Sequence, residues 1–369
     1  MTGKTRRVDI DLLRVIGILF VVAYHYGAIP SELFAVDYFR SILSICVPVF
    51  FFVTGVLYSS REFPLRKGVH KALKLVVLTS VWGTVLWISM AKILGKSVTL
   101  GSWVSGVLTL EQGVINHLWF LPSIAILYLL LPFFCALQRD EPRLFNGLCA
   151  LSLFFAFGLD ALSRLINLPA LFAGAGLSTK LSTFMYMFSP LKGIHGESVA
   201  LCLAGMWISG RESLLIERVL GCGDRASKIR RALFALVIVF ACPAVLAMDA
   251  KVRFAFTGEA YDPTWGGYTF AGTFVLVAAL YLMLFRARAV LASSRRVAKA
   301  ISRIGGNTLA IYLLHPLLRT VTYSTILSVY SPIDRLAVGM LASLASCVCF
   351  AIIGALLTKT RPGKWLLTV

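Results

Sequence analysis

Two polar residues bound the first strongly apolar stretch of the chain, RVIGILFVVAYH, which begins at Arg14 and ends at His25. On an α-helix their separation of eleven residues is a rotation of about 1100°, only about 20° from three full turns, and a rise of about 16 Å. The two side chains are therefore predicted to share one helix face. Such a pair could hold a phosphorylated group at the guanidinium and present the far end of a long, thin ligand to the imidazole.

Each of these residues also has a structural alternative. Arg14 could be a snorkelling arginine at a helix end, paired with Asp11 in the preceding turn. His25 could be an interfacial histidine between Tyr24 and Tyr26. The shared face favours the functional interpretation without deciding it.

A second imidazole and guanidinium lie in YLLHPLLR, where His315 and Arg319 are at i and i+4 and share a helix face. An unpaired cation is costly within a membrane, so we expect Arg319 to have either an internal partner or a bound anion. The two residues are candidates for cofactor binding. A purely structural tie to a backbone carbonyl or an acidic side chain is the alternative.

Two further polar sites lie near the predicted outer membrane face. In NHLWFLP, His117 and Trp119 are candidates for substrate binding, although a belt of interfacial aromatic residues is the common alternative. Asp160 and Arg164 have the i, i+4 spacing of an ion pair and are assigned a structural role.

Several familiar catalytic motifs are missing from the sequence. It has no P-loop, GxSxG, HExxH or paired Cys/His pattern, which argues against ATP-driven transport, serine-hydrolase chemistry and zinc proteolysis. The eight cysteines fall almost entirely within apolar stretches and form no CxxC, so we predict neither a disulfide framework nor a metal site. Histidine is then the best available general base, because its ordinary pKa lies near physiological pH.

The elements that must position these residues are membrane helices. Of the 369 residues, 58% are hydrophobic and 14% charged, and the mean hydropathy is +0.83, outside the range of soluble domains. Apolar stretches of roughly 20 residues, long enough to cross a bilayer, recur along the chain. We predict an all-α polytopic membrane protein of ten spans: 12–29, 41–59, 75–94, 118–138, 146–166, 194–210, 232–249, 268–285, 308–329 and 336–357.

Lysine and arginine counts predict the orientation of these spans. One set of alternate segments, including both termini, holds 25 of them and the opposite set holds 9, so both termini are expected to be cytoplasmic. Because this asymmetry is what topology requires, the formal charge of +19 does not indicate nucleic-acid binding. The cytoplasmic cations instead suggest a phosphorylated ligand or anionic lipid headgroups.

The chain is expected to form a single bundle over residues 1–369, with no fused soluble domain. Residues 181–192 are aromatic but stopped by Pro190, which indicates an interfacial or re-entrant piece before the sixth span.

Five motifs in this order make the chain resemble the membrane acyltransferase-3 family, integral-membrane O-acyltransferases that modify bacterial surface glycans and some small molecules. Each motif is weak alone, but their order is specific. They are DLLRVIGILFVVAYH (11–25), VPVFFFVTGVLYS (47–59), HLWFLPSIAILYLLLP (117–132), ALCLAGMWISGRE (200–212) and NTLAIYLLHPLL (307–318).

The resemblance implies a ten-helix core, an acyl-CoA donor on the cytoplasmic side, a catalytic His25 and an essential Arg14. Where relatives often carry R-x-x-R after the second helix, this chain has Lys71 and Lys74. Lysine attracts phosphate as a point charge but lacks the bidentate fork of arginine. We assign Lys71 and Lys74 to the CoA phosphates, with single rather than paired hydrogen bonds expected from each.

The resulting hypothesis is a multi-pass enzyme of the bacterial inner membrane that moves an acyl group, acetyl being favoured, from acyl-CoA to a hydroxyl of a sugar or lipid-linked glycan. His25 would act as general base or carry the acyl group itself. Acyl transfer to a small metabolite, a transporter or flippase of glycan precursors, and a sensory or scaffold protein with a vestigial site are the alternatives.

Overall fold

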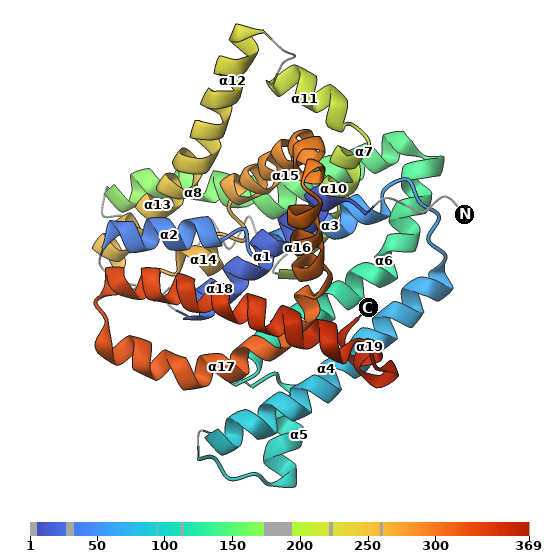
Figure 1. Ribbon diagram of the computed structural model, residues 1–369. Helices are drawn as coiled ribbons and strands as arrows, with labels where there is room; N and C mark the ends of the chain where they lie inside the picture. The colour runs from blue at the N-terminus through green and yellow to red at the C-terminus, as the bar shows by residue number, and fades with distance from the viewer. Residues whose placement is uncertain are drawn as a thin grey trace.

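The computed structural model describes residues 6–26, 33–93, 95–111, 114–172, 194–220, 224–258 and 261–368. The described part of the chain is helical throughout and contains no strand (Figure 1). The first half comprises α1 (Val8–Tyr26), α2 (Phe34–Leu43), α3 (Pro48–Tyr58), α4 (Leu65–Ile93), α5 (Leu100–Leu108), the short 3-10 helix η1 (Asn116–Trp119), α6 (Phe120–Asp140), α7 (Pro142–Leu153), the π-helical turn η2 (Phe154–Gly158) and α8 (Leu159–Phe172).

The second half begins at α10 and ends near the C-terminus. It comprises α10 (Ile194–Ser209), α11 (Glu212–Leu220), α12 (Arg225–Leu236), the π-helical turn η3 (Val237–Ala241), α13 (Cys242–Thr257), α14 (Pro263–Gly266), α15 (Ala271–Ser293), α16 (Arg295–Gly306), α17 (Thr308–Val329), α18 (Pro332–Leu357) and α19 (Arg361–Leu367).

The prediction of a helical protein with many membrane-crossing helices is confirmed in part. Within the described residues, seven helices or runs of consecutive helices are long and apolar enough to cross a membrane, and the pair α10–α11, bent by 83°, makes a possible eighth. Helices α1 and α17, which cover the predicted spans 12–29 and 308–329, are not among these seven. The stretch predicted as 41–59 is divided into α2 and α3, because Pro48 occupies the first turn of α3 and cannot donate a backbone hydrogen bond. The total of ten spans and the cytoplasmic termini stay predictions, and 181–192 lies outside the described residues.

Helix α4 begins earlier than its predicted span of 75–94. It starts at Leu65, directly after Pro64, and continues without interruption to Ile93. Lys71 and Lys74, expected in a loop, are therefore held on a helix, and this fixes the direction in which each side chain points.

Helix α1 occupies the middle of the bundle (Figure 1). It packs against α15, α16, α17 and α18, and also against α2 and α3. Its apolar residues are buried on several sides, with Leu13, Ile18 and Val22 almost completely removed from solvent. The helix that carries Arg14 and His25 is thus enclosed by the rest of the fold.

The predicted ion pair between Asp160 and Arg164 is confirmed, with Nε of Arg164 donating to the carboxylate at 2.6 Å. Arg164 also pairs with Asp249 of α13 and donates to the hydroxyl of Tyr261 at 3.0 Å. The pair therefore joins α8 to α13 and to the segment before α14, which agrees with the structural role predicted for it.

Helices α3 and α10 pack closely against each other, and this contact depends on two glycines. A Cβ atom at Gly55 would lie 1.9 Å from the carbonyl oxygen of Cys202, and one at Gly205 would lie 2.1 Å from that of Phe52. Small residues that let backbones meet are a usual means of helix association in membranes.

Substituting Gly55→Ala should therefore destabilise the bundle by about 1–3 kcal/mol, the usual cost of overpacking a tight contact. The control is Gly147→Ala on α7, where a Cβ would have nothing within 4 Å. Thermal unfolding in detergent should show a lower midpoint for Gly55→Ala only. Equal midpoints for the two variants would contradict the assigned helix contact.

Candidate active site

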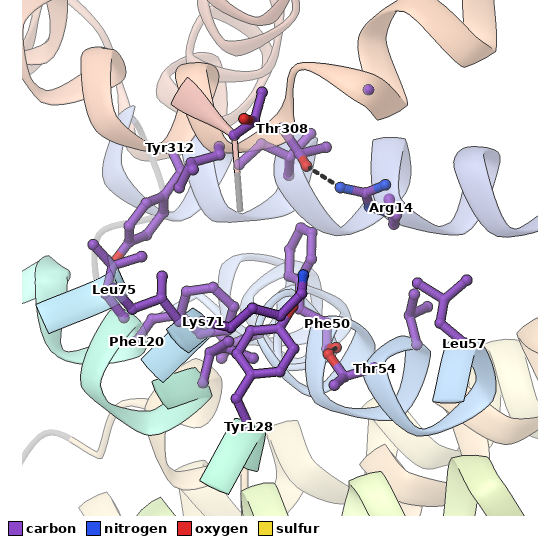
Figure 2. A pocket seen from close by; sticks show the side chains of 18 of the residues that line it. Arg14, Phe50, Thr54, Leu57, Lys71, Leu75, Phe120, Tyr128, Thr308 and Tyr312 are labelled. Carbon is purple, nitrogen blue, oxygen red and sulfur yellow. Dashed lines mark hydrogen bonds between the residues drawn. The ribbon is translucent and has the colours of Figure 1, made fainter. Parts of the chain in front are cut away.

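Arg14 faces a cavity of about 380 Å³ that lies between α1, α3, α4, α6 and α17. Its Nη2 donates to the hydroxyl of Thr308 at 3.0 Å, as Figure 2 shows. The expected pairing with Asp11 is loose, at 4.0 Å, because that carboxylate accepts at 2.5 Å from Arg6 and at 2.9 Å from Ser302. The guanidinium is thus held at the cavity wall without being neutralised by a close carboxylate.

Two more cations line this first cavity, Arg61 and Lys71, and no carboxylate is among the described residues that line it. The Nζ atom of Lys71 lies 4.8 Å from the ring centre of Tyr128, and both side chains are drawn in Figure 2. Lys74 does not line the cavity, and its Nζ lies 5.5 Å from the ring centre of Trp365 instead. Of the two lysines predicted for phosphate, the structure therefore brings only Lys71 to Arg14.

His25 lines a second cavity, of about 350 Å³. His117 and Trp119, the two residues predicted for substrate, line the same cavity, although they lie about a quarter of the chain away in sequence. Its wall also includes Tyr24, Asn116 and Tyr268. The structure thus assembles three of the predicted site residues around one enclosed space.

The two cavities share four wall residues, Val21, Val47, Phe120 and Tyr312. Val21 lies on α1 between Arg14 and His25, so the two cavities follow each other along one helix over the rise of about 16 Å expected from their spacing. The shared wall is apolar apart from one tyrosine hydroxyl, and that hydroxyl donates to the carbonyl of His117. The arrangement is a cationic chamber joined to an aromatic and imidazole-lined chamber.

Three imidazoles meet at the second chamber. The ring centroids of His25 and His315 are 5.2 Å apart, those of His117 and His315 5.7 Å, and those of His25 and His117 6.3 Å. No group of side chains in the described residues has the arrangement of a metal site. Imidazoles this close to one another can exchange protons, because the ordinary pKa of histidine lies near physiological pH.

The local sequence of α17 explains how His315 is held. Pro316 has no N–H to donate to the carbonyl of Tyr312, four residues earlier. Nδ1 of His315 occupies that position and lies 2.8 Å from this carbonyl oxygen, and 3.2 Å from that of Ile311. The Y-x-x-H-P motif thus uses the histidine to satisfy a carbonyl that its own proline leaves without a backbone donor.

Arg319 contacts backbone near the imidazoles. Its Nε donates to the carbonyl oxygen of His25 at 2.9 Å, which is the tie to a backbone carbonyl named above as the structural alternative. Neither Arg319 nor His315 is among the described residues lining either cavity. The structure places both at the imidazole end of the site, away from Arg14 and Lys71.

A buried ion pair lies next to the second chamber. Arg40 is 1% exposed and contacts Asp262 at 2.5 Å, while the hydroxyl of Tyr24 donates to the same carboxylate at 2.8 Å. Sequence reasoning did not connect Asp262 to the site of His25. The connection requires α2 and the segment before α14, which are far apart in sequence, to meet beside Tyr24 of α1.

Sequence reasoning also missed Arg61, Thr308 and Tyr312 as cavity residues, and Glu197, a buried carboxyl whose Oε2 has no hydrogen-bond partner among the residues that the structure describes. Tyr312 carried a signal, because it begins the Y-x-x-H-P motif. Arg61 carried none, since it was one of many cytoplasmic cations.

A chain with this fold and site is a polytopic membrane protein with two joined internal chambers. A family model described as an acyltransferase domain, that of the acyltransferase-3 family, matches residues 7–356. The protein therefore belongs to this family of membrane acyltransferases, as its motifs predicted. No curated protein and no solved structure matches the chain.

Proposed function

We propose that this membrane acyltransferase moves an acyl group, acetyl being favoured, from acyl-CoA to a hydroxyl of a sugar or lipid-linked glycan. The observation that carries the proposal is the pair of joined chambers along α1, with cations in one and His25 in the other. Family membership supplies the reaction class. The donor, the acyl group and the acceptor are inferred from the chemistry of the two chambers.

The first chamber suits the phosphorylated end of CoA. Arg14, Arg61 and Lys71 line it without a lining carboxylate among the described residues, so a multiply charged anion would find its counter-ions there. Hydrogen bonds between cations and phosphate oxygens are shorter and stronger than neutral ones. Because position 71 is a lysine and not an arginine, bidentate hydrogen bonds to a phosphate group would come from Arg14 and Arg61.

The sidedness of this chamber supports a cytoplasmic donor. Besides α1, its wall includes Arg61, Gly306 and Thr368, which belong to segments predicted to be cytoplasmic from their lysine and arginine content. The second chamber includes Asn116, from a segment predicted to lie outside. A donor entering from the cytoplasm would direct its thioester toward His25. The membrane proposed for the enzyme is the inner membrane of a bacterium.

The chemistry assigned to His25 is proton transfer. The imidazole takes the proton from the acceptor hydroxyl, whose oxygen attacks the thioester carbonyl carbon. The carbon–sulfur bond then breaks, and the imidazolium returns its proton to the departing thiolate. In a covalent variant, the imidazole nitrogen attacks the thioester carbonyl carbon and the CoA thiolate departs. The acceptor hydroxyl then attacks the acylated imidazole, which leaves as the free imidazole, and the hydroxyl proton passes to the thiolate.

The second chamber favours a hydroxylated acceptor. Tyr24, Trp119 and Tyr268 supply flat faces with polar edges, and Asn116 and His117 add further hydrogen-bonding groups. This mixture suits a sugar, whose hydroxyls need polar partners while its ring presents apolar C–H groups. A purely hydrocarbon acceptor would leave these polar groups without partners, which is costly in a closed site.

Substituting Arg14→Ala should weaken binding of CoA about tenfold or more, because a charge-assisted contact to phosphate is lost. Calorimetry on the purified protein in detergent measures this affinity. The matched control is Arg139→Ala, since this arginine is 56% exposed, pairs with Asp140 and does not line the cavity. Unchanged affinity in Arg14→Ala would return Arg14 to the role of a snorkelling residue.

Substituting His25→Ala should lower transfer of labelled acetyl from acetyl-CoA to an acceptor at least about 100-fold, the usual minimum contribution of a general base. CoA affinity should change little, because His25 does not line the first cavity. His70→Ala, at an exposed histidine of α4, is the control and should transfer normally. Wild-type rates in the His25 variant would refute its catalytic role.

The acceptor class is tested in cells. A strain lacking the protein should lose an acetyl-sized or longer acyl mass from one envelope glycan while exporting that glycan in normal amounts, as mass spectrometry of purified envelope fractions would show. Expression of wild-type protein, but not of the His25→Ala variant, should restore the mass. Loss of export itself would favour the transporter alternative, and an acyl mass lost from a soluble metabolite would favour a small-molecule acceptor.

A further inference from the structure

Two buried nitrogen atoms next to His25 have no hydrogen-bond partner in the described part of the chain. They are the Nε2 atoms of His117 and His315. Buried polar atoms are nearly always paired, so an unpaired one in a site requires an explanation. Two such atoms around a third imidazole indicate that they form hydrogen bonds with a group that is absent or differently oriented in the resting structure.

The contacts of His315 determine which of its nitrogens carries hydrogen. Its Nδ1 lies against two backbone carbonyl oxygens, at 2.8 Å and 3.2 Å. A carbonyl oxygen only accepts, so Nδ1 must be the donor and Nε2 of the neutral ring must be an acceptor. Pro316 stabilises this tautomer, because it removes the backbone N–H that would otherwise compete for the carbonyl of Tyr312.

The separation of the two rings suits a hydrogen bond between His315 and His25. The two ring centroids are 5.2 Å apart and the rings are tilted by 34°. Two imidazoles that share one N–H···N hydrogen bond have centroids separated by about 5 Å, the donor–acceptor distance plus the distance from each nitrogen to its ring centre. The observed separation matches this value, and catalytic hydrogen bonds often tighten only when substrate is bound.

The backbone keeps the two residues at this separation. Arg319 of α17 donates to the carbonyl of His25 at 2.9 Å, and Tyr26 of α1 donates to the carbonyl of His315 at 3.2 Å. Ser346 of α18 in turn donates to the hydroxyl of Tyr26 at 3.1 Å. Each histidine is thus fixed through its own carbonyl by a side chain of the other histidine's helix.

We propose that His315 is a positioning residue whose Nε2 accepts the ring N–H of His25, so that the second nitrogen of His25 is unprotonated and faces the acceptor chamber. The proposal rests on the catalytic role proposed for His25. His315 does not line that chamber and so acts through His25 rather than on substrate. The other titratable or charged groups close to the His25 ring are His117, Arg319 and Tyr24.

Two substitutions separate this role from a structural one. His315→Asn keeps a donor near the position of Nδ1, which satisfies the carbonyl of Tyr312, but it removes the acceptor at Nε2. His315→Gln has the opposite effect, because its amide oxygen reaches the position of Nε2. We expect His315→Asn to lower kcat about 100-fold with an unchanged KM for acyl-CoA, and His315→Gln to stay within about tenfold of wild type. The reverse order would overturn the proposal.

A measurement on the resting protein tests the same contact without any transfer reaction. The chain has only five histidines, so isotope-labelled histidine in bilayer samples allows solid-state NMR to report the tautomer of each ring. Wild type and His315→Gln should show His25 in one tautomer, and His315→Asn should show a mixture. A mixture in the wild type would refute the positioning role.

The two measurements also separate this proposal from the proposed function. If wild type transfers no acyl group while His25 still shows one tautomer that His315→Asn disturbs, the proposed function fails and the contact between the two histidines stands. If wild type transfers and His315→Asn transfers equally well, the proposed function stands and the positioning role fails.

Discussion

The site depends on one uninterrupted helix that carries both of its ends. Backbone hydrogen bonds fix the rise of α1 at about 1.5 Å per residue, so the separation of Arg14 and His25 along the helix cannot drift with side-chain packing. Helices α3, α6 and α17 border the space along that one face, while α15, α16 and α18 pack directly against α1. A ligand lying along α1 would therefore have its two ends placed by the covalent and hydrogen-bonded structure of a single element.

The interior of an apolar bundle also constrains every polar atom near this face, because bilayer hydrocarbon offers no hydrogen bonds. Arg319 and Tyr26 resolve this by donating across the contact between α1 and α17 to the carbonyls of His25 and His315. His315 resolves it within its own helix, by donating to the carbonyl that Pro316 leaves without a backbone donor. The same hydrogen bonds that satisfy the interior set the geometry of the imidazole cluster.

Charge distinguishes the two chambers. Cations without lining carboxylates dominate the first in the described part of the chain, whereas next to the second chamber Arg40 is neutralised by Asp262. An anionic ligand is thus attracted to the first chamber, whose lining cations have no lining carboxylate beside them among the described residues. This asymmetry would orient a donor with a phosphorylated head and a neutral tail before any specific contact forms.

The sequence by itself determined the helical membrane class and the placement of Arg14 and His25 on one helix face, since hydropathy and helical periodicity act within one segment. The order of its motifs determined the family. It also predicted an internal partner or a bound anion for Arg319 and the ion pair of Asp160 with Arg164, because charge inside a membrane must be compensated.

Only the tertiary structure decided that His117 and His315 converge on His25, that Lys71 but not Lys74 reaches the chamber of Arg14, and that Asp262 contacts Tyr24 next to His25. The physical reason is that these neighbours come from helices and loops far apart in the chain. Their meeting is fixed by packing contacts such as that of Gly55 with the backbone of α10, and no local periodicity encodes it.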